Sequence, residues 1–175
     1  MIQSRIKAVV RDVPDFPKPG IVFKDITPIL KDPILCEDII VALAAQLEGI
    51  QIDVVAGIES RGFLFGPSLA QHLKVPFVPI RKAGKLPYKT LRQSYDLEYG
   101  EAVIEMHEDA LQAGQKVLIH DDLLATGGTV VAASKLIQQL DAEVAAYSFI
   151  ISLDFLKGAE RLTSYSDQVY RLAAY

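Results

Sequence analysis

The order of apolar segments predicts an α/β fold with a mainly parallel sheet flanked by helices. Short, almost wholly apolar runs alternate with segments in which apolar residues recur every three or four positions. The first pattern is typical of strands buried on both faces, and the second of amphipathic helices. The chain has 175 residues, of which 50% are hydrophobic and 23% charged, so a single globular domain with a substantial core is expected.

The N-terminal half begins this alternation. A short helix is expected over residues 2–11, followed by an irregular segment to residue 27 that is rich in proline and aspartate. Asp32 and Pro33 suit the cap and the first position of a helix that runs to Gly49. Three elements then follow in order, a buried strand over 53–57, a helix over 63–73 and a second strand over 75–80.

The C-terminal half continues the pattern after a basic segment. Residues 81–93 combine lysine and arginine with glycine and proline, which predicts a mobile loop. Strands separated by helices imply parallel neighbours joined by crossovers. The remaining expected elements are strands over 102–106 and 116–120, a helix from Gly128 through Leu140, and a strand over 144–153.

The segment from Val117 to Thr129 contains the clearest functional signal. An apolar strand leads to two aspartates, and a turn of small residues then opens a helix. In open α/β sheets, ligands bind at the carboxyl ends of the strands. Backbone N–H groups at a helix N-terminus favour a phosphate by geometry and by dipole. The candidate phosphate-binding residues are therefore Ala125, Thr126, Gly127, Gly128 and Thr129.

The two aspartates, Asp121 and Asp122, need another partner, because carboxylates repel a bare phosphate. They suit the vicinal hydroxyls of a ribose, or a divalent cation that is bound to phosphate. A ligand with a 5-phosphate at one end and ribose hydroxyls at the other satisfies both halves of the segment. The competing interpretation is a helix cap followed by an ordinary glycine turn. The ordered combination of strand, acid pair, small turn and helix favours the ligand site.

Composition and missing motifs exclude several classes of function. The chain contains neither GxxxxGK[ST] nor GxGxxG, so a simple NTPase and a dinucleotide oxidoreductase are not expected. The net charge of −4 gives no support for a nucleic-acid partner, and no apolar run is long enough to predict a membrane partner. The single cysteine, Cys36, fits a cytoplasmic location.

Two further stretches can contact phosphate groups. Ser60 and Arg61 follow the strand over 53–57, where Arg61 can clamp a diphosphate or stack on a base. The basic segment forms either a solvated loop or a lid that neutralises a diphosphate leaving group and excludes water. Its cations are Arg81, Lys82, Lys85, Lys89 and Arg92.

The segment over 117–129 resembles the phosphoribosyl diphosphate (PRPP) binding motif of type I phosphoribosyltransferases. Four other stretches are similar to the adenine branch of that family and occur in its order: DFPKPGIVFKDITP (15–28), GIESRGFLFG (57–66), IRKAGKLP (80–87) and SYDLEYG (94–100). The resemblance implies the type I phosphoribosyltransferase fold in a single domain over 1–175. Residues from about 1 to 30 would form a small N-terminal hood over the base site, and those from about 81 to 98 a mobile lid loop.

The resemblance also implies an activity, in which the 5-phosphoribosyl group passes from PRPP to N9 of adenine, giving AMP and diphosphate. It implies Mg²⁺ carried by PRPP without a direct protein ligand, small-molecule substrates only, and a homodimer. Glu98 would be the catalytic residue that handles the proton of the base. Val22, Phe23 and Lys24 would bind adenine, with Phe23 stacked on it.

Family resemblance assigns the diphosphate contacts as well. Ser60 and Arg61 would contact diphosphate through a cis peptide, which is either the Glu59–Ser60 or the Ser60–Arg61 bond. In the basic segment the contacts would be Arg81, Lys82 and Lys85, with Lys85 reaching across a subunit boundary, and Lys89 and Arg92 would face solvent.

Two alternatives stay open at this point. The base could be hypoxanthine, guanine or xanthine, because no single residue proves the choice of adenine. A PRPP-sensing regulator of the same fold is the second alternative. The acidic balance, the absence of an added domain and the presence of Glu98 count against it.

His120 stands where the family has an apolar residue before the acid pair. We interpret it as a local packing variation rather than a catalytic base. His72 and His107 are not spaced with it as a metal site.

Overall fold

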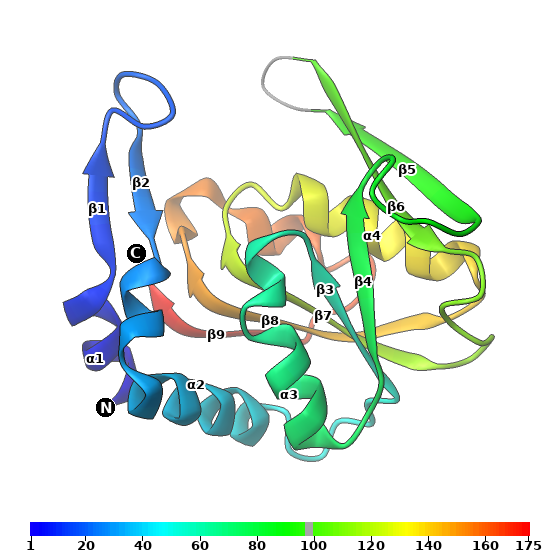
Figure 1. The fold of residues 1–175 in the computed structure, drawn as a ribbon, viewed down its shortest axis with the longest axis horizontal. Coiled ribbons are helices and arrows are strands. Elements are labelled where there is room, and N and C mark those ends of the chain that lie inside the picture. Colours follow the sequence, from blue (N-terminus) through cyan, green and yellow to red (C-terminus); the bar gives the residue numbers. More distant parts are fainter. Residues whose placement is uncertain (97–99) are drawn as a thin grey trace.

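The computed structural model describes residues 1–96 and 100–175, which fold around a seven-stranded sheet of order β5-β6-β4-β3-β7-β8-β9 (Figure 1). The strands from β4 to β9 in this order run parallel, and β5 and β6 add an antiparallel edge. The expectation of a mainly parallel sheet is confirmed. The strands are β3 (Val54–Ile58), β4 (Phe77–Lys82), β5 (Thr90–Asp96), β6 (Glu101–His107), β7 (Lys116–Leu124), β8 (Glu143–Ser152) and β9 (Val169–Ala174).

Helices cover both faces of this sheet (Figure 1). Successive residues of a strand point to opposite faces, so Val55 lies in one apolar cluster and Ala56 in the other. Leu118 and Ile119 of β7 are divided in the same way. Burial on both faces explains why these strands are continuous apolar runs. The first cluster includes residues of α1 (Ile2–Val9), α2 (Pro33–Gln46) and α3 (Gly66–Leu73), and the second includes residues of α4 (Gly128–Gln139).

Helix α2 begins as its sequence predicts. The side chain of Asp32 accepts a hydrogen bond of 3.0 Å from the backbone N–H of Leu35, and Pro33 occupies the first turn. The helix ends at Gln46, three residues before the expected end at Gly49, whose φ of +83° turns the chain toward β3.

The prediction of an irregular segment over 12–27 is wrong for half of its length. The strands β1 (Arg11–Pro14) and β2 (Val22–Asp25) form an antiparallel hairpin that stands beside the main sheet (Figure 1). Two of the four facing pairs are oppositely charged, Arg11 with Asp25 and Asp12 with Lys24, the latter with Nζ and Oδ1 2.6 Å apart. Such a hairpin lacks the apolar alternation by which a strand is recognised in a sequence.

The loop expected over 81–98 is shorter than predicted. Strand β4 continues to Lys82, and Thr90–Asp96 pair with β6 along the whole of β5. Leu91 and Tyr95 also pack against the core, which favours strand over loop. Among residues 81–96, which the structure describes, the irregular part is therefore 83–89, and its mobility stays a prediction. No helix in the described part of the chain is long and apolar enough to cross a membrane.

Candidate active site

The acid pair lies inside strand β7 rather than after it. Pairing with the long strand β8 continues β7 as far as Leu124, beyond the expected end at His120. Asp122 is 1% exposed and Asp121 is half-buried. Oδ1 of Asp121 accepts a hydrogen bond of 2.8 Å from the backbone N–H of Asp122.

The electrostatics of this pair favour a partner that brings hydroxyl donors or positive charge. Burial, and then the neighbouring Asp122 carboxylate, raise the pKa of Asp121 well above its ordinary value. Burial also raises the pKa of Asp122, although the Arg61 guanidinium acts in the opposite direction. In addition, Oδ2 of Asp122 is buried and accepts no hydrogen bond among the described residues, although it is ion-paired with Nε of Arg61 at 3.2 Å.

The turn over 125–129 follows the acid pair and leads into α4, which begins at Gly128 as predicted. Gly127 has a φ of +79°, and a Cβ atom there would lie 2.8 Å from the carbonyl oxygen of Gly158. A Cβ on Gly158 would come within 2.1 Å of the carbonyl oxygen of Ala125. Two glycines thus allow the turn to pack on the segment after β8, where Arg161 donates from Nη1 to the Thr126 carbonyl at 3.2 Å.

Ser60 and Arg61 occupy the turn after β3, as expected, and the Glu59–Ser60 peptide is cis. Nε of Arg61 lies 3.2 Å from Oδ2 of Asp122. Its guanidinium carbon lies 4.9 Å from the centre of the Phe23 ring in β2. Arg61 therefore connects the acid pair with the N-terminal hairpin.

Arg81 is already held by a partner that the sequence did not indicate. Its Nε and Nη2 atoms donate to the two carboxylate oxygens of Glu59 at 3.1 and 3.0 Å. Glu59 also accepts from the backbone N–H of Lys82 at 3.0 Å. The hydrogen bond from Arg81 is the main reason why the pKa of Glu59 lies below its ordinary value. The side chains of Lys82 and Lys85 are exposed.

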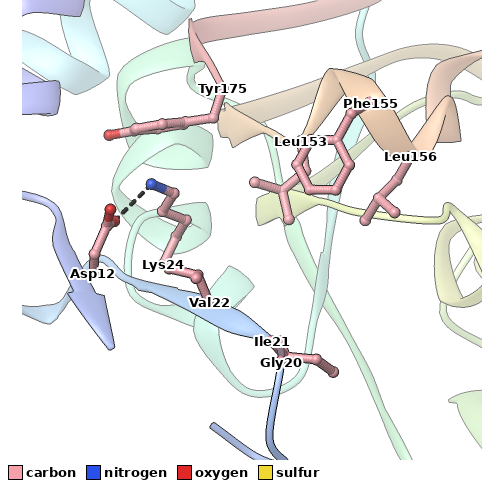
Figure 2. A pocket seen from close by; sticks show the side chains of 9 residues that line it. All are labelled: Asp12, Gly20, Ile21, Val22, Lys24, Leu153, Phe155, Leu156 and Tyr175. Atoms are coloured by element: carbon pink, nitrogen blue, oxygen red, sulfur yellow. Dashed lines mark hydrogen bonds and ion pairs between the residues drawn. The ribbon is translucent and has the colours of Figure 1, made fainter. Parts of the chain in front are cut away.

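A mainly apolar cavity of about 540 Å³ lies between the hairpin and the C-terminal part of the chain (Figure 2). Figure 2 shows Lys24 below the ring of Tyr175 at one end, with Nζ 4.1 Å from the ring centre, and Leu153, Phe155 and Leu156 at the other. The lining residues are Asp12, Gly20, Ile21, Val22, Lys24, Leu153, Phe155, Leu156 and Tyr175.

The predicted base-binding residues divide between two environments. Val22 and Lys24 line the cavity, but Phe23 does not. Its ring contacts Arg61 and packs edge-on against Phe16, with ring centres 5.1 Å apart. Alternation along β2 accounts for this division, because neighbouring side chains of a strand point to opposite sides.

Sequence reasoning missed the segment after β8, which serves both halves of the site. Phe155 and Leu156 line the cavity, whereas Gly158 and Arg161 contact the turn over 125–129. The glycine at position 158, after Lys157, was the sole local sign in the sequence that two backbone segments approach each other closely here. Glu98, predicted to be catalytic, lies outside the described residues.

Comparisons with known proteins agree with this geometry. Residues 26–169 match the family described as "Phosphoribosyl transferase domain". An adenine phosphoribosyltransferase of Cytophaga hutchinsonii is 53% identical over 175 residues, which are 100% of this chain and 97% of the relative. One from Thermobifida fusca is 53% identical over 161 residues, which are 92% of each chain.

Solved structures of the same kind superpose closely. The adenine phosphoribosyltransferase of Thermoanaerobacter pseudethanolicus has a TM-score of 0.95 at 48% identity, covering 99% of both chains. The Saccharomyces cerevisiae enzyme, crystallised with an imino-altritol bisphosphate and adenine, has a TM-score of 0.91 at 42% identity, covering 97% of both chains.

Proposed function

The chain belongs to the adenine phosphoribosyltransferase family, and we propose that it transfers the 5-phosphoribosyl group of PRPP to N9 of adenine, giving AMP and diphosphate. One observation carries the proposal. The half-buried Asp121, the buried Asp122 and the turn over 125–129 follow each other along the chain. An apolar cavity of about 540 Å³ lies nearby, since its lining residue Leu153 donates a backbone hydrogen bond of 2.9 Å to Leu124. A ribose phosphate with an attached purine presents hydroxyls, an anion and an apolar ring, one for each of these three features.

The sugar phosphate would bind at the carboxyl end of β7. The N–H groups of the turn over 125–129 and the hydroxyls of Thr126 and Thr129 would surround the 5-phosphate. Asp121 and Asp122 would accept hydrogen bonds from the ribose hydroxyls. As the bond to diphosphate breaks, the ribose gains oxocarbenium character, and two nearby carboxylates stabilise that positive charge.

The diphosphate would bind between two basic stretches. Ser60 and Arg61 approach it from the turn after β3, and Lys82 and Lys85 from the segment after β4. Arg81 joins this set only if it leaves Glu59, with which it shares two hydrogen bonds. Cations at this position neutralise the leaving group, which lowers the barrier to its departure.

Adenine would enter the cavity beneath the hairpin. Backbone groups of Val22 and Lys24 read the edge of the base, and Leu153 provides an apolar face. Phe23 is covered by Arg61 in this structure, so stacking on the base requires Arg61 to move toward the diphosphate. Arg61 would then respond to both substrates.

Glu98 would handle the proton of the base as N9 attacks with inversion at the anomeric carbon. General acid–base transfers of this kind contribute about 10²–10⁴-fold in rate. Glu98 follows β5, whose end at Asp96 lies beside Gly128 in the wall of a second cavity.

The residues present fit a magnesium ion that arrives with the substrate. Asp121 and Asp122 would approach the ion through water or substrate oxygens, because Mg²⁺ in such sites keeps several waters and binds substrate phosphates. When bound, the ion neutralises diphosphate charge.

We also propose that the enzyme is a cytoplasmic homodimer. The cytoplasmic location agrees with the single cysteine, which cannot form a disulfide bond within the chain. Apolar side chains lie exposed on and around α2, including Ile34 at 67%, Val41 at 50% and Leu64 at 39%. Side chains of this kind suit an interface with a second copy. Sedimentation velocity of the wild type and of Ile34→Asp tests this, and a monomeric wild type would contradict it.

Diphosphate release from PRPP in the presence of Mg²⁺ tests the proposed reaction. The assay compares adenine with hypoxanthine, guanine and xanthine at equal concentration. We expect release with adenine and formation of an equal amount of AMP. Preference for another base would refute adenine specificity, and release independent of any base would refute the transfer reaction.

A further inference from the structure

One buried carboxylate in strand β6 has no part in the site described so far. Glu105 is 1% exposed and lies in the middle of the strand. Its Oε1 atom accepts three backbone hydrogen bonds, from Gly84 at 3.0 Å, Lys85 at 3.1 Å and Leu86 at 3.1 Å. Three successive N–H groups therefore converge on one oxygen, and the loop after β4 curves around it.

The second oxygen of Glu105 is equally engaged. Oε2 accepts from the hydroxyl of Thr90 at 3.2 Å and lies 3.3 Å from Nε of Arg92. Burial raises the pKa of Glu105, but hydrogen bonds from Leu86, Thr90, Gly84 and Lys85 outweigh burial, so the pKa lies below its ordinary value. The side chain is thus a fully hydrogen-bonded anion at neutral pH.

These contacts determine where Lys85 lies. Its N–H is bound to Glu105, and its carbonyl accepts from Nη1 of Arg81 at 3.2 Å. Gly84, with a φ of +82°, makes the turn that such a curve requires. The backbone of Lys85 is therefore held from both sides while its side chain is exposed.

We propose that Glu105 is a positioning residue for the diphosphate of PRPP, because it holds the loop over 84–86 in the conformation that presents Lys85. This inference rests on the proposed function. Only a carboxylate suits the position, because both of its oxygens accept. An amide in its place would turn its NH₂ group either toward the backbone donors at Oε1 or toward the side-chain donors at Oε2. Its negative charge also offsets repulsion among the cations of the loop.

The substitution Glu105→Gln tests the proposal, with Glu108→Gln as the matched control. Glu108 directly follows the same strand but is exposed, and its Oε1 atom is 3.8 Å from Nζ of Lys89. We expect the KM for PRPP to rise by about tenfold or more in Glu105→Gln, because a buried acceptor for several donors is lost. The KM for adenine and the Kd for AMP should change by less than about twofold, since neither ligand contains diphosphate. Glu108→Gln should resemble the wild type.

A double-mutant cycle separates positioning from a general structural role. If Glu105 acts through Lys85, then Glu105→Gln adds little to the PRPP KM once Lys85→Met is present. Additive effects would contradict the proposal. Thr90→Val, which removes one donor to Oε2, should raise the PRPP KM in the same direction and gives an independent test if Glu105→Gln does not fold.

Two failures can be told apart. A wild-type protein that releases no diphosphate with any base refutes the proposed function itself. An active wild type, with a PRPP KM that stays unchanged in both Thr90→Val and a folded Glu105→Gln, refutes the role of Glu105 alone. AMP binding reports that each variant is folded.

Discussion

Nε of Arg61 lies 3.2 Å from Oδ2 of Asp122, whose side chain is 2% exposed. The pair joins a turn after β3 to the buried acids of β7. The same guanidinium also covers the ring of Phe23, so it contacts the N-terminal hairpin as well. Arg61 therefore connects the acid pair, where we propose that ribose binds, with the hairpin beside the proposed adenine site.

Replacing Arg61 with alanine should weaken both binding and stability. We expect kcat/KM for PRPP to fall by about 100-fold, because a charged contact to diphosphate is lost. Stability should fall by about 2 kcal/mol, less than for a fully buried pair, since the Arg61 side chain is 34% exposed. Steady-state kinetics and urea unfolding measure the two effects.

The control for Arg61 is Arg5→Ala, which should change neither the kinetics nor the stability, because its partner Asp38 lies at the surface. An Arg61→Ala variant with wild-type PRPP kinetics would contradict the assignment.

Asp121→Asn should make the protein more stable and less active. The raised pKa of Asp121 means that its ionised form is disfavoured in the folded state. Above that pKa the negative charge lowers the free energy of unfolding, and asparagine removes the charge. As pH falls through the raised pKa, the wild-type carboxyl becomes protonated and the difference should shrink. Thermal unfolding at pH 8 and pH 5 measures this.

The matched control for Asp121 is Asp53→Asn, which should act in the opposite direction. The pKa of Asp53 is lowered, first by the backbone hydrogen bond from Lys116 and then by Gln51. A carboxylate whose pKa is lower in the folded than in the unfolded state stabilises the fold at neutral pH. This stabilisation is lost when acidification protonates the carboxylate. If Asp121→Asn were less stable than the wild type at pH 8, the ionised form of Asp121 would not be disfavoured in the folded protein, which would contradict this account.

Local patterns predicted much of this fold, including the turn over 125–129 to which we assign phosphate binding. Helix α2 is marked by Asp32 and Pro33, and α4 by the glycines before it, so both starts follow from nearby residues. The buried strand β3 is recognisable because it is apolar on both faces. The turn over 125–129 needed only its own residues and those of the preceding strand.

Long-range partners explain what the sequence did not reveal. Glu59 holds Arg81, and Glu105 holds the loop over 84–86, yet neither acid has a local pattern that indicates its partner. The base cavity likewise combines Val22 with Leu153, more than a hundred residues later in the chain. Such pairs become apparent only when the sheet order is known.

The buried histidine should make the protein sensitive to acid. Nδ1 of His120 lies 2.9 Å from the hydroxyl of Ser148, and burial lowers the pKa of His120 from 6.5 to about 4. Between these two values the unfolded chain binds a proton and the folded chain does not, so stability falls as pH decreases. The loss should reach about 3 kcal/mol near pH 4.

The double substitution His120→Val and Ser148→Ala tests this effect without leaving an unpaired hydroxyl. Urea unfolding at pH 7 and pH 5 should show a smaller loss on acidification in the variant than in the wild type. An identical loss in both proteins would assign the acid sensitivity to other groups.

Tyr175 should matter for adenine and not for PRPP. Its ring lines the cavity and covers the ammonium group of Lys24 at 4.1 Å. Tyr175→Leu removes this cation–π contact, and we expect the KM for adenine to rise by about fivefold. Tyr175→Phe is the matched control, because it keeps the ring and removes a buried hydroxyl that has no hydrogen-bond partner within residues 1–96 and 100–175. An adenine KM unchanged in Tyr175→Leu would place the base elsewhere.

Isothermal titration of PRPP into the protein at millimolar Mg²⁺ examines the sugar phosphate site most directly. The wild type should show saturable heat with one site per chain. The variant carrying Asp121→Asn and Asp122→Asn should lose most of that affinity, since its ribose contacts are removed. Absence of heat with the wild type, or equal affinity in the variant, would contradict the assignment of the acid pair and its neighbouring turn to one ligand.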